Sequence, residues 1–242
     1  MAQALVPLKD LVAAKSRLSG VLSPVERRSL AQAMVEDVLT VLAHHTQISA
    51  VTLVSDDVSA AMIAAKYGIN HWLEHSLACR GLNPIISRSC ELLAQQSEQA
   101  IIVLHGDLPC LKADDISAVL SGLEQSGGLI VGCDRHERGT NLLAFATGDA
   151  PEFSFGKDSC ARHCASAAAR GISTQILRRP GIALDVDEPR DLGLLMDEIE
   201  QGHGGHTAAL LSSSALGGRV RTQLASMTAT APTRSSSKGA VK

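Results

Sequence analysis

Two aspartates separated by a single residue, Asp185 and Asp187, follow a short apolar run that predicts a strand. In extended backbone alternate side chains share one face, so both carboxylates would point the same way and Val186 the other. Such carboxylates repel each other unless a cation lies between them, and their hard oxygens suit Mg²⁺. The alternative is that Asp187 caps the helix predicted to begin near Pro189, and the two roles can coexist.

A third acid, Asp107, follows the clearest predicted strand, residues 100–104, within the segment Gly106-Asp107-Leu108-Pro109. Pro109 cannot continue a strand ladder and turns the chain away, so Asp107 lies where a buried strand meets solvent. A carboxylate in that place is well positioned to bind a divalent cation. Taken alone, the pattern also fits an ordinary turn cap.

Three cations and a hydroxyl lie within nine residues after the first predicted strand: Lys9, Lys15, Ser16 and Arg17. Lysine supplies a point charge and arginine a bidentate fork, so this segment could hold a polyphosphate. It lacks the glycines of a Walker loop. The alternative is a solvated connector.

The segment from residue 134 to residue 159 carries the remaining polar candidates, among them Thr140, Gly156 and Ser159. Ser159 opens a predicted helix, whose first backbone N–H groups favour an anion. Gly156 allows close approach of the backbone, and Ser159 can donate a hydrogen bond from the first turn. The alternative is a plain N-cap by Asp158.

The elements that must position these side chains alternate between apolar strand patterns and amphipathic helix patterns. Strands are predicted at residues 4–8, 50–54, 69–73, 100–104, 129–133, 142–146, 174–177 and 182–184. Helices are predicted at residues 24–44, 58–67, 83–96, 114–125, 159–170 and 189–200. The helix at 24–44 begins with Ser23 as N-cap, Pro24 at N1 and Glu26 closing a capping box.

This alternation predicts an α/β fold with a mostly parallel, Rossmann-like central sheet and helices on both faces. In such sheets ligands bind beyond the carboxyl ends of the strands, which is where the polar segments above lie.

Composition excludes several classes of protein. The chain has 242 residues, 45% of them hydrophobic, and a formal net charge of −3. Its apolar runs are too short to span a bilayer, and no secretory signal is visible, so we expect a soluble, cytoplasmic protein without a membrane partner. Only five residues are aromatic, which argues against a nucleic-acid partner.

The six cysteines form no Cys-x-x-Cys pair, and we expect them to be reduced, buried core residues. A metal site at Cys160, His163 and Cys164 is the disfavoured alternative.

Composition changes sharply at residue 202. Residues 203–242 contain five cations, no acid and few large apolar residues, so we predict a disordered basic tail after a domain at residues 1–202.

No single one of these segments identifies a protein family, but the order and spacing of the segments do. In chain order, the segments are Lys9 to Arg17, Leu82-Asn83, Gly106-Asp107-Leu108-Pro109, Asp134-Arg135, Gly139-Thr140-Asn141, Phe155-Gly156-x-x-Ser159 and Asp185-Val186-Asp187. The series resembles the 2-phospho-L-lactate, phosphoenolpyruvate or 3-phospho-D-glycerate guanylyltransferase family of coenzyme F420 biosynthesis, which has a glycosyltransferase-A-like nucleotidyltransferase fold. The likeness covers about residues 4–200.

The resemblance implies transfer of GMP from GTP to the phosphate of a three-carbon acid, with release of pyrophosphate. It implies a catalytic group made of three Mg²⁺ ligands and a lysine: Asp107, Asp185, Asp187 and Lys15. It implies contacts to the phospho-acid from Lys9, Thr140, Gly156 and Ser159. It implies contacts to the GTP phosphates from Lys15, Ser16 and Arg17, and a nucleoside pocket lined by Ser55, Asp56, Leu82 and Asn83.

The sequence departs from the family pattern at Glu137-Arg138, where a Gly-Thr pair usually stands. The extra polarity suits the hydroxyl of 3-phospho-D-glycerate and favours that acid. Two alternatives stay open: another nucleotidyltransferase of the same fold, acting on a molybdenum cofactor or a sugar phosphate, and a non-catalytic nucleotide-binding module. The first would want a glycine-rich first loop, and the second need not keep three acids. A homodimer is also left open.

Overall fold

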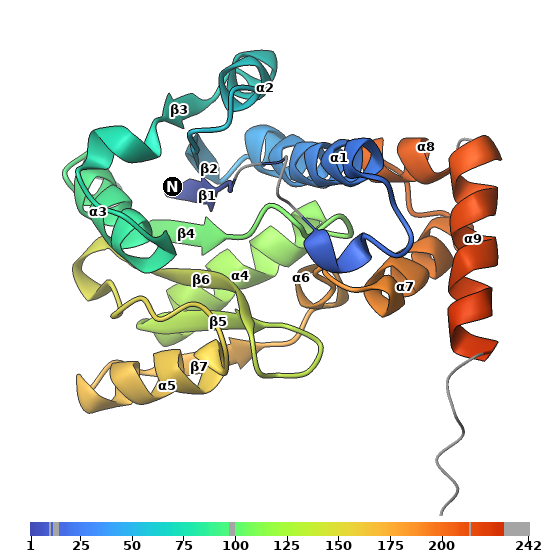
Figure 1. Cartoon of the computed structure of the whole chain (residues 1–242). Helices are drawn as coiled ribbons and strands as arrows, with labels where there is room; N and C mark the ends of the chain where they lie inside the picture. The colour runs from blue at the N-terminus through green and yellow to red at the C-terminus, as the bar shows by residue number, and fades with distance from the viewer. Residues whose placement is uncertain (10, 12–14, 97–99, 213, 230–242) are drawn as a thin grey trace, which may run out of the picture.

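One sheet of seven strands organises the protein (Figure 1). The computed structural model describes residues 1–9, 11, 15–96, 100–212 and 214–229. In spatial order the strands are β3 (Asn70–Trp72), β2 (Ile48–Val54), β1 (Ala2–Pro7), β4 (Ala100–Leu104), β6 (Thr140–Ala146), β5 (Leu129–Cys133) and β7 (Thr174–Leu177). Neighbouring strands pair in parallel, except that β6 lies antiparallel to β4 and β5. The predicted mostly parallel sheet is confirmed.

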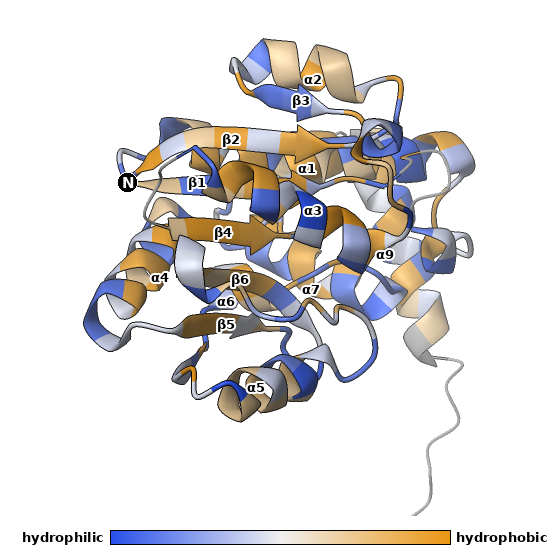
Figure 2. Cartoon of the chain, turned by 90° about the vertical axis from the view of Figure 1, so that its left-hand side faces the viewer, coloured by the Kyte–Doolittle hydropathy of each residue, from blue (hydrophilic) through white to orange (hydrophobic). Residues whose placement is uncertain are grey.

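Helices cover both faces of this sheet, as predicted. They are α1 (Pro24–His44), α2 (Ala60–Tyr67), α3 (Leu82–Ala94), α4 (Ala113–Ser126), α5 (Ser159–Ala169), α6 (Pro180–Ala183), α7 (Pro189–Glu200), α8 (His206–Ser212) and α9 (Ser214–Ala229), with short 3₁₀ turns at Ser16–Leu18, Glu74–Leu77 and Thr147–Asp149. Val6 of β1 packs in a core with α1, α4 and α7, while its neighbour Leu5 packs in a second core with α3 and α5. Both faces of the central strands are therefore apolar, and β2 and β4 are largely orange in Figure 2.

The start of α1 follows the predicted capping box. The backbone N–H of Glu26 donates to Ser23 Oγ at 3.3 Å, and the backbone N–H of Ser23 donates to Glu26 Oε2 at 2.8 Å. Pro24 takes the first helical position, where its missing N–H costs nothing.

The predicted strand at residues 182–184 is wrong, because Pro180–Ala183 forms the short helix α6. Pro180 starts this helix at its first turn, where a fixed φ favours helical backbone. Arg179, just before it, is held by an ion pair to Asp115 of α4 at 2.8 Å. Asp185 and Asp187 therefore follow a helical turn rather than a strand.

The predicted disorder from residue 203 is wrong for residues 203–212 and 214–229, while residues 213 and 230–242 lie outside the described part. The carboxylate of Asp37 in α1 accepts from the backbone N–H groups of His206 and Thr207, at 2.5 and 3.0 Å, and so satisfies the start of α8. Val220 of α9 is fully buried against the main core. Small residues lowered the apparent hydrophobicity of this segment, but they let its helices pack closely.

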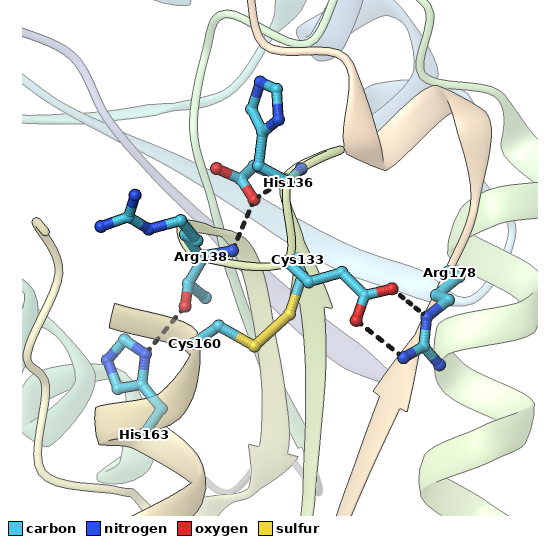
Figure 3. Close-up of a disulfide and its surroundings, with 9 residues drawn as sticks. Cys133, His136, Arg138, Cys160, His163 and Arg178 are labelled. Atoms are coloured by element: carbon cyan, nitrogen blue, oxygen red, sulfur yellow. Dashed lines mark hydrogen bonds and ion pairs between the residues drawn. A yellow bond between two sulfur atoms is a disulfide. The ribbon is translucent and has the colours of Figure 1, made fainter. Parts of the chain in front are cut away.

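The cysteines do not all remain free. A disulfide joins Cys133, the last residue of β5, to Cys160 in the first turn of α5, with the Cα atoms 6.1 Å apart (Figure 3). The expectation that all cysteines are reduced is therefore wrong for this pair. Spacing along the chain could not reveal it, since the strand and helix meet only in the fold. Cys90 and Cys110 are buried thiols as expected, whereas Cys79 and Cys164 are only half-buried.

No helix in the described residues is both long and apolar enough to cross a membrane.

Candidate active site

A pocket of about 1300 Å³ opens at the carboxyl ends of β1 and β4, where the predicted segments converge. Ten predicted site residues line it: Lys9, Lys15, Arg17, Leu82, Asp107, Thr140, Gly156, Ser159, Asp185 and Asp187. The expectation that ligands bind beyond the strand ends therefore agrees with the position of this pocket.

The ammonium group of Lys15 lies between two of the predicted aspartates. Its Nζ donates to Asp107 Oδ2 at 2.6 Å and to Asp187 Oδ1 at 2.7 Å, and its side chain is only 9% exposed. The loop that carries Lys15 is anchored upstream, where the backbone N–H of Leu11 donates to Asp57 Oδ2 at 2.8 Å. Lys15 itself has a left-handed backbone, with φ 57°. At Lys15, therefore, the segment is buried and ion-paired, and it is not the solvated connector that was the alternative.

The neighbouring charges fix the protonation states of Lys15 and Asp107. Burial opposes the charge on Lys15, but the two carboxylates outweigh it and raise the pKa of the ammonium above its ordinary value. Burial likewise opposes ionisation of Asp107, yet the charge of Lys15 keeps the pKa of that carboxyl below its usual range. Lys15 and Asp107 are therefore both charged near neutral pH. The carboxylate of Asp107 pairs with Lys15 rather than capping a turn.

Asp185 lies in a different electrostatic position from its neighbours. Asn141 Nδ2 donates to Asp185 Oδ1 at 3.2 Å and to the carbonyl of Ile182 at 2.9 Å. Burial and the negative charge of Asp107 raise the pKa of Asp185 to about 6. Asp107 and Asp185 are therefore close enough to repel each other, and no cationic side chain pairs with Asp185 among the described residues.

The three aspartates do not form the ready-made metal cage that the sequence predicted. Within the described residues, no group of three or more His, Cys, Asp or Glu side chains is placed to hold a metal ion. The reason is the ammonium of Lys15, which takes the place between Asp107 and Asp187. One observation still fits a cation: Asp107 Oδ1 is buried without a hydrogen-bond partner in the described structure. Together with Asp185 it offers the hard oxygen ligands that Mg²⁺ takes.

The alternative role for Asp187, as the cap of α7, is not what the structure shows. Glu188 is the N-cap of that helix, in a capping box with Asp191. Asp191 also pairs with Arg135 at 2.5 Å. The side chain of Asp187 is left for Lys15.

The lining of the pocket also includes the residues that the resemblance assigns to the phospho-acid: Lys9, Thr140, Gly156 and Ser159. The backbone N–H of Ser154 donates to His163 Nε2 at 2.9 Å, so the ring carries its proton on Nδ1 and donates it to Thr140 Oγ1 at 3.0 Å. His163 stays neutral, because burial lowers its pKa to about 4. The Thr140 hydroxyl keeps its own proton for another acceptor. Gly156, also in the lining of the pocket, has φ 124°, a conformation that favours glycine.

Asp158, the alternative cap of α5, occupies the N-cap position but makes no capping hydrogen bond with its side chain. Its Oδ1 instead accepts from Arg138 Nε at 2.8 Å, and both residues line the pocket. Glu137 does not line the pocket and accepts two hydrogen bonds from Arg178, at 2.6 and 2.9 Å. Of the two residues that depart from the family pattern, only Arg138 therefore lines the pocket.

Four predicted nucleotide contacts do not line this pocket: Ser16, Ser55, Asp56 and Asn83. Ser16 is exposed at the start of a 3₁₀ turn. Ser55 is fully buried and accepts from the backbone N–H of Asp57 at 3.0 Å. The amide of Asn83 holds the backbone of Phe155, accepting from its N–H at 2.8 Å and donating to its carbonyl at 3.3 Å.

Sequence reasoning assigned no role to several residues that shape the site. Asn141 holds Asp185, and its place directly after Thr140 could have suggested this. His105 lines the pocket and packs edge-on against Phe155, with ring centroids 5.1 Å apart. Asp57 anchors the loop before Lys15, and nothing in its spacing indicates that contact.

The fold is that of nucleotidyltransferases. A protein from Desulfovibrio desulfuricans G20, assigned as a nucleotide-diphospho-sugar transferase, superposes with a TM-score of 0.78 at 16% identity, over 92% of this chain and 97% of that one. A cytidylyltransferase from Leptospira borgpetersenii superposes with a TM-score of 0.58 at 11% identity, over 90% and 95% of the two chains. At these identities the likeness concerns the fold alone.

Sequence comparison gives the family. The family model described as "Guanylyl transferase CofC like" matches residues 2–227, and the chain belongs to this family. A phosphoenolpyruvate guanylyltransferase of Sphaerobacter thermophilus is 38% identical over 189 residues, 78% of this chain and 89% of that protein. A 3-phospho-D-glycerate guanylyltransferase of Phenylobacterium zucineum is 35% identical over 216 residues, 88% and 96% of the two chains. The resemblance inferred from the motifs is confirmed.

Proposed function

We propose that the protein transfers GMP from GTP to the phosphate of a three-carbon phospho-acid and releases pyrophosphate, as a step of coenzyme F420 biosynthesis. The observation that carries the proposal is Lys15, held between Asp107 and Asp187 in a pocket that Thr140 and Ser159 also line. Such a pocket offers adjoining places for two anions. Membership of the guanylyltransferase family supports the same reaction.

The chemistry asks little of a general base. A phosphate oxygen of the acid forms a bond to the α-phosphorus of GTP, while the bond from that phosphorus to the oxygen bridging to the β-phosphate breaks. The attacking phosphate is already anionic, so no proton has to be removed. Catalysis then consists of positioning and charge neutralisation.

We assign a binding role to each of the predicted residues in turn. Lys15, Arg17 and Ser16 contact the phosphates of GTP, with Lys15 as the buried point charge. The acid's phosphate and carboxylate take hydrogen bonds from Lys9, Thr140 and Ser159 and from the backbone at Gly156. The hydrogen bond from His163 to Thr140 supports this, because it leaves the threonine hydroxyl free to donate to the acid.

We also propose a Mg²⁺ ion, held by Asp107 and Asp185 with Asp187 beside them. The unpartnered Asp107 Oδ1 and the repulsion between Asp107 and Asp185 support this choice. A bound Mg²⁺ would neutralise phosphate charge and so ease attack on the α-phosphorus.

The three candidate acceptors are three-carbon acids, each of which carries a phosphate and a carboxylate. Arg138 lines the pocket and supports 3-phospho-D-glycerate, whose hydroxyl offers it a further partner. Glu137 adds nothing to this choice, since it is paired with Arg178.

The test is pyrophosphate release by the purified protein with Mg²⁺, GTP and each of the three acids in turn. We expect turnover with at least one acid, highest for 3-phospho-D-glycerate, and a loss of about 10²- to 10³-fold in kcat for Asp107→Asn at unchanged circular dichroism. A clear preference for phosphoenolpyruvate would refute the role of Arg138. Turnover only with a sugar phosphate or a molybdenum cofactor, or no turnover with any acceptor, would refute the proposed function.

A further inference from the structure

A second cavity, of about 570 Å³, adjoins the active-site pocket at the start of α3. Its wall includes Asp56, Glu74 and the loop at residues 78–81. Gly81 of this wall is followed directly by Leu82, which lines the active-site pocket. The two cavities therefore share the N-terminal end of α3, and a ligand bound in both would run past this end.

The residues expected to form the nucleoside pocket cannot by themselves distinguish one base from another. Ser55 is buried and engaged with Asp57, and the amide of Asn83 is engaged with Phe155. The carboxylate of Asp56 accepts from His75, at 3.2 Å from its backbone N–H and 2.8 Å from Nδ1. Leu82 remains, and an apolar side chain contacts guanine and adenine equally well.

Glu74 is an acidic group in the second cavity with unused hydrogen-bonding capacity. Among the described residues, its carboxylate takes part in no hydrogen bond or ion pair. Burial and the negative charge of Asp56 raise the pKa of Glu74, whereas Lys9, across in the active-site pocket, lowers it. A half-buried carboxylate in this position gains from a ligand that donates hydrogen bonds to it.

We propose that Glu74 recognises the purine base of the nucleoside triphosphate by accepting hydrogen bonds from N1–H and the 2-amino group of guanine. This assignment rests on the proposed function, which places a nucleotide in the adjoining pocket. Guanine presents these two donors side by side, and an ionised carboxylate has two oxygens to accept them. Adenine presents the lone pair of N1 instead, which an ionised carboxylate repels. Hypoxanthine keeps N1–H but lacks the 2-amino group.

Arg80, from the same wall, complements this recognition. Its guanidinium has no partner among the described residues and lies on the loop that follows Glu74. The O6 and N7 atoms of guanine are both acceptors, and arginine donates to that pair in a bidentate manner. A carboxylate and a guanidinium on one wall thus match the donor and acceptor edges of guanine.

The test compares kcat/KM for GTP, ITP and ATP in the wild type, in Glu74→Gln and in Glu91→Gln. Glu91 is an exposed residue of α3 paired with Arg88, so its variant is a matched control. We expect the wild type to prefer GTP to ITP and ATP. Glu74→Gln should lower kcat/KM for GTP by about 10- to 100-fold and bring the GTP-to-ITP ratio close to one, with KM for the acid unchanged. Glu91→Gln should change neither value.

GTP binding measured by titration calorimetry separates this inference from the proposed function. If the wild type transfers GMP but Glu74→Gln keeps the wild-type GTP-to-ITP ratio, the role of Glu74 is refuted and the function stands. A wild type that does not prefer GTP to ITP refutes the role as well. If the wild type transfers no nucleotide, the proposed function fails, and calorimetry decides the role of Glu74: weaker GTP binding by Glu74→Gln supports it, and equal binding refutes it.

Discussion

Removal of the Cys133–Cys160 crosslink is expected to lower the free energy of unfolding by about 3–4 kcal/mol. The two cysteines are 27 residues apart, and the loop-closure entropy for a loop of that size amounts to about 3.6 kcal/mol at 25 °C. For a chain of this length, that loss corresponds to a decrease in Tm of about 7–14 °C. Both cysteines are buried, so the bond is protected from solvent in the folded protein.

The crosslink also bears on the active site, because the loop that it closes contains Thr140, Gly156 and Ser159, the proposed contacts to the phospho-acid. Cys160 follows Ser159 directly, and its backbone N–H donates to the carbonyl of Arg138 at 3.0 Å. Freeing this loop should raise KM for the acid several-fold, while KM for GTP changes less, since Lys15 lies outside the loop.

The assay is urea unfolding with and without a phosphine reductant, applied to the wild type and to the double variant Cys133→Ala/Cys160→Ala. Reductant should destabilise the wild type and leave the double variant unchanged, because that variant has no crosslink to lose. The same four samples give KM for the acid and for GTP. An unfolding curve of the wild type that does not respond to reductant, under conditions that reduce every disulfide, would refute the reasoning.

Three further changes test other parts of the structure. Lys15→Met leaves Asp107 without its partner and should lower kcat by at least 10²-fold, measured by pyrophosphate release; unchanged kcat would contradict the role of the ammonium. His163 has a pKa of about 4 in the folded protein against about 6.5 when unfolded, so the unfolded chain binds more protons between those values and stability should fall by up to about 3 kcal/mol as pH drops from 6.5 to 4. Urea unfolding at pH 7.5 and 5 should show this loss in the wild type and a smaller one in His163→Gln. Val220→Ala in α9 should cost about 2 kcal/mol by the same method, whereas a disordered tail would show no change.

The sequence predicted the sheet well because its information is local. The run at residues 100–104 is apolar at every position, as a strand covered on both faces must be, and all five residues of β4 are buried. The capping residues Ser23 and Glu26 likewise act within one turn of helix. From these elements the general rule for parallel sheets placed Asp107 and Lys15 at one edge, where the pocket lies.

Apart from the strand predicted at residues 182–184, the errors concern contacts between distant segments. The helix α8 is satisfied by Asp37, which lies about 170 residues earlier, so composition alone predicted disorder there. Cys133 and Cys160 meet only because α5 packs beside β5. The contact of the Asn83 amide with the backbone of Phe155, 72 residues later, is likewise not visible in the sequence. No local pattern contains any of these pairings.

Charge balance explains why the three acids did not assemble into a cage. Among the described residues that line the active-site pocket, five are cations and five are anions, counting the histidines as neutral: Lys9, Lys15, Arg17, Arg138 and Lys157 against Asp107, Asp134, Asp158, Asp185 and Asp187. Lys15 pairs with Asp107 and Asp187, and Arg138 pairs with Asp158. GTP and a phospho-acid together bring several negative charges into a pocket with no net charge of its own. When a lysine or arginine side chain leaves its carboxylate to bind a phosphate, that carboxylate loses its partner. A divalent cation can bind carboxylates and phosphates at the same time.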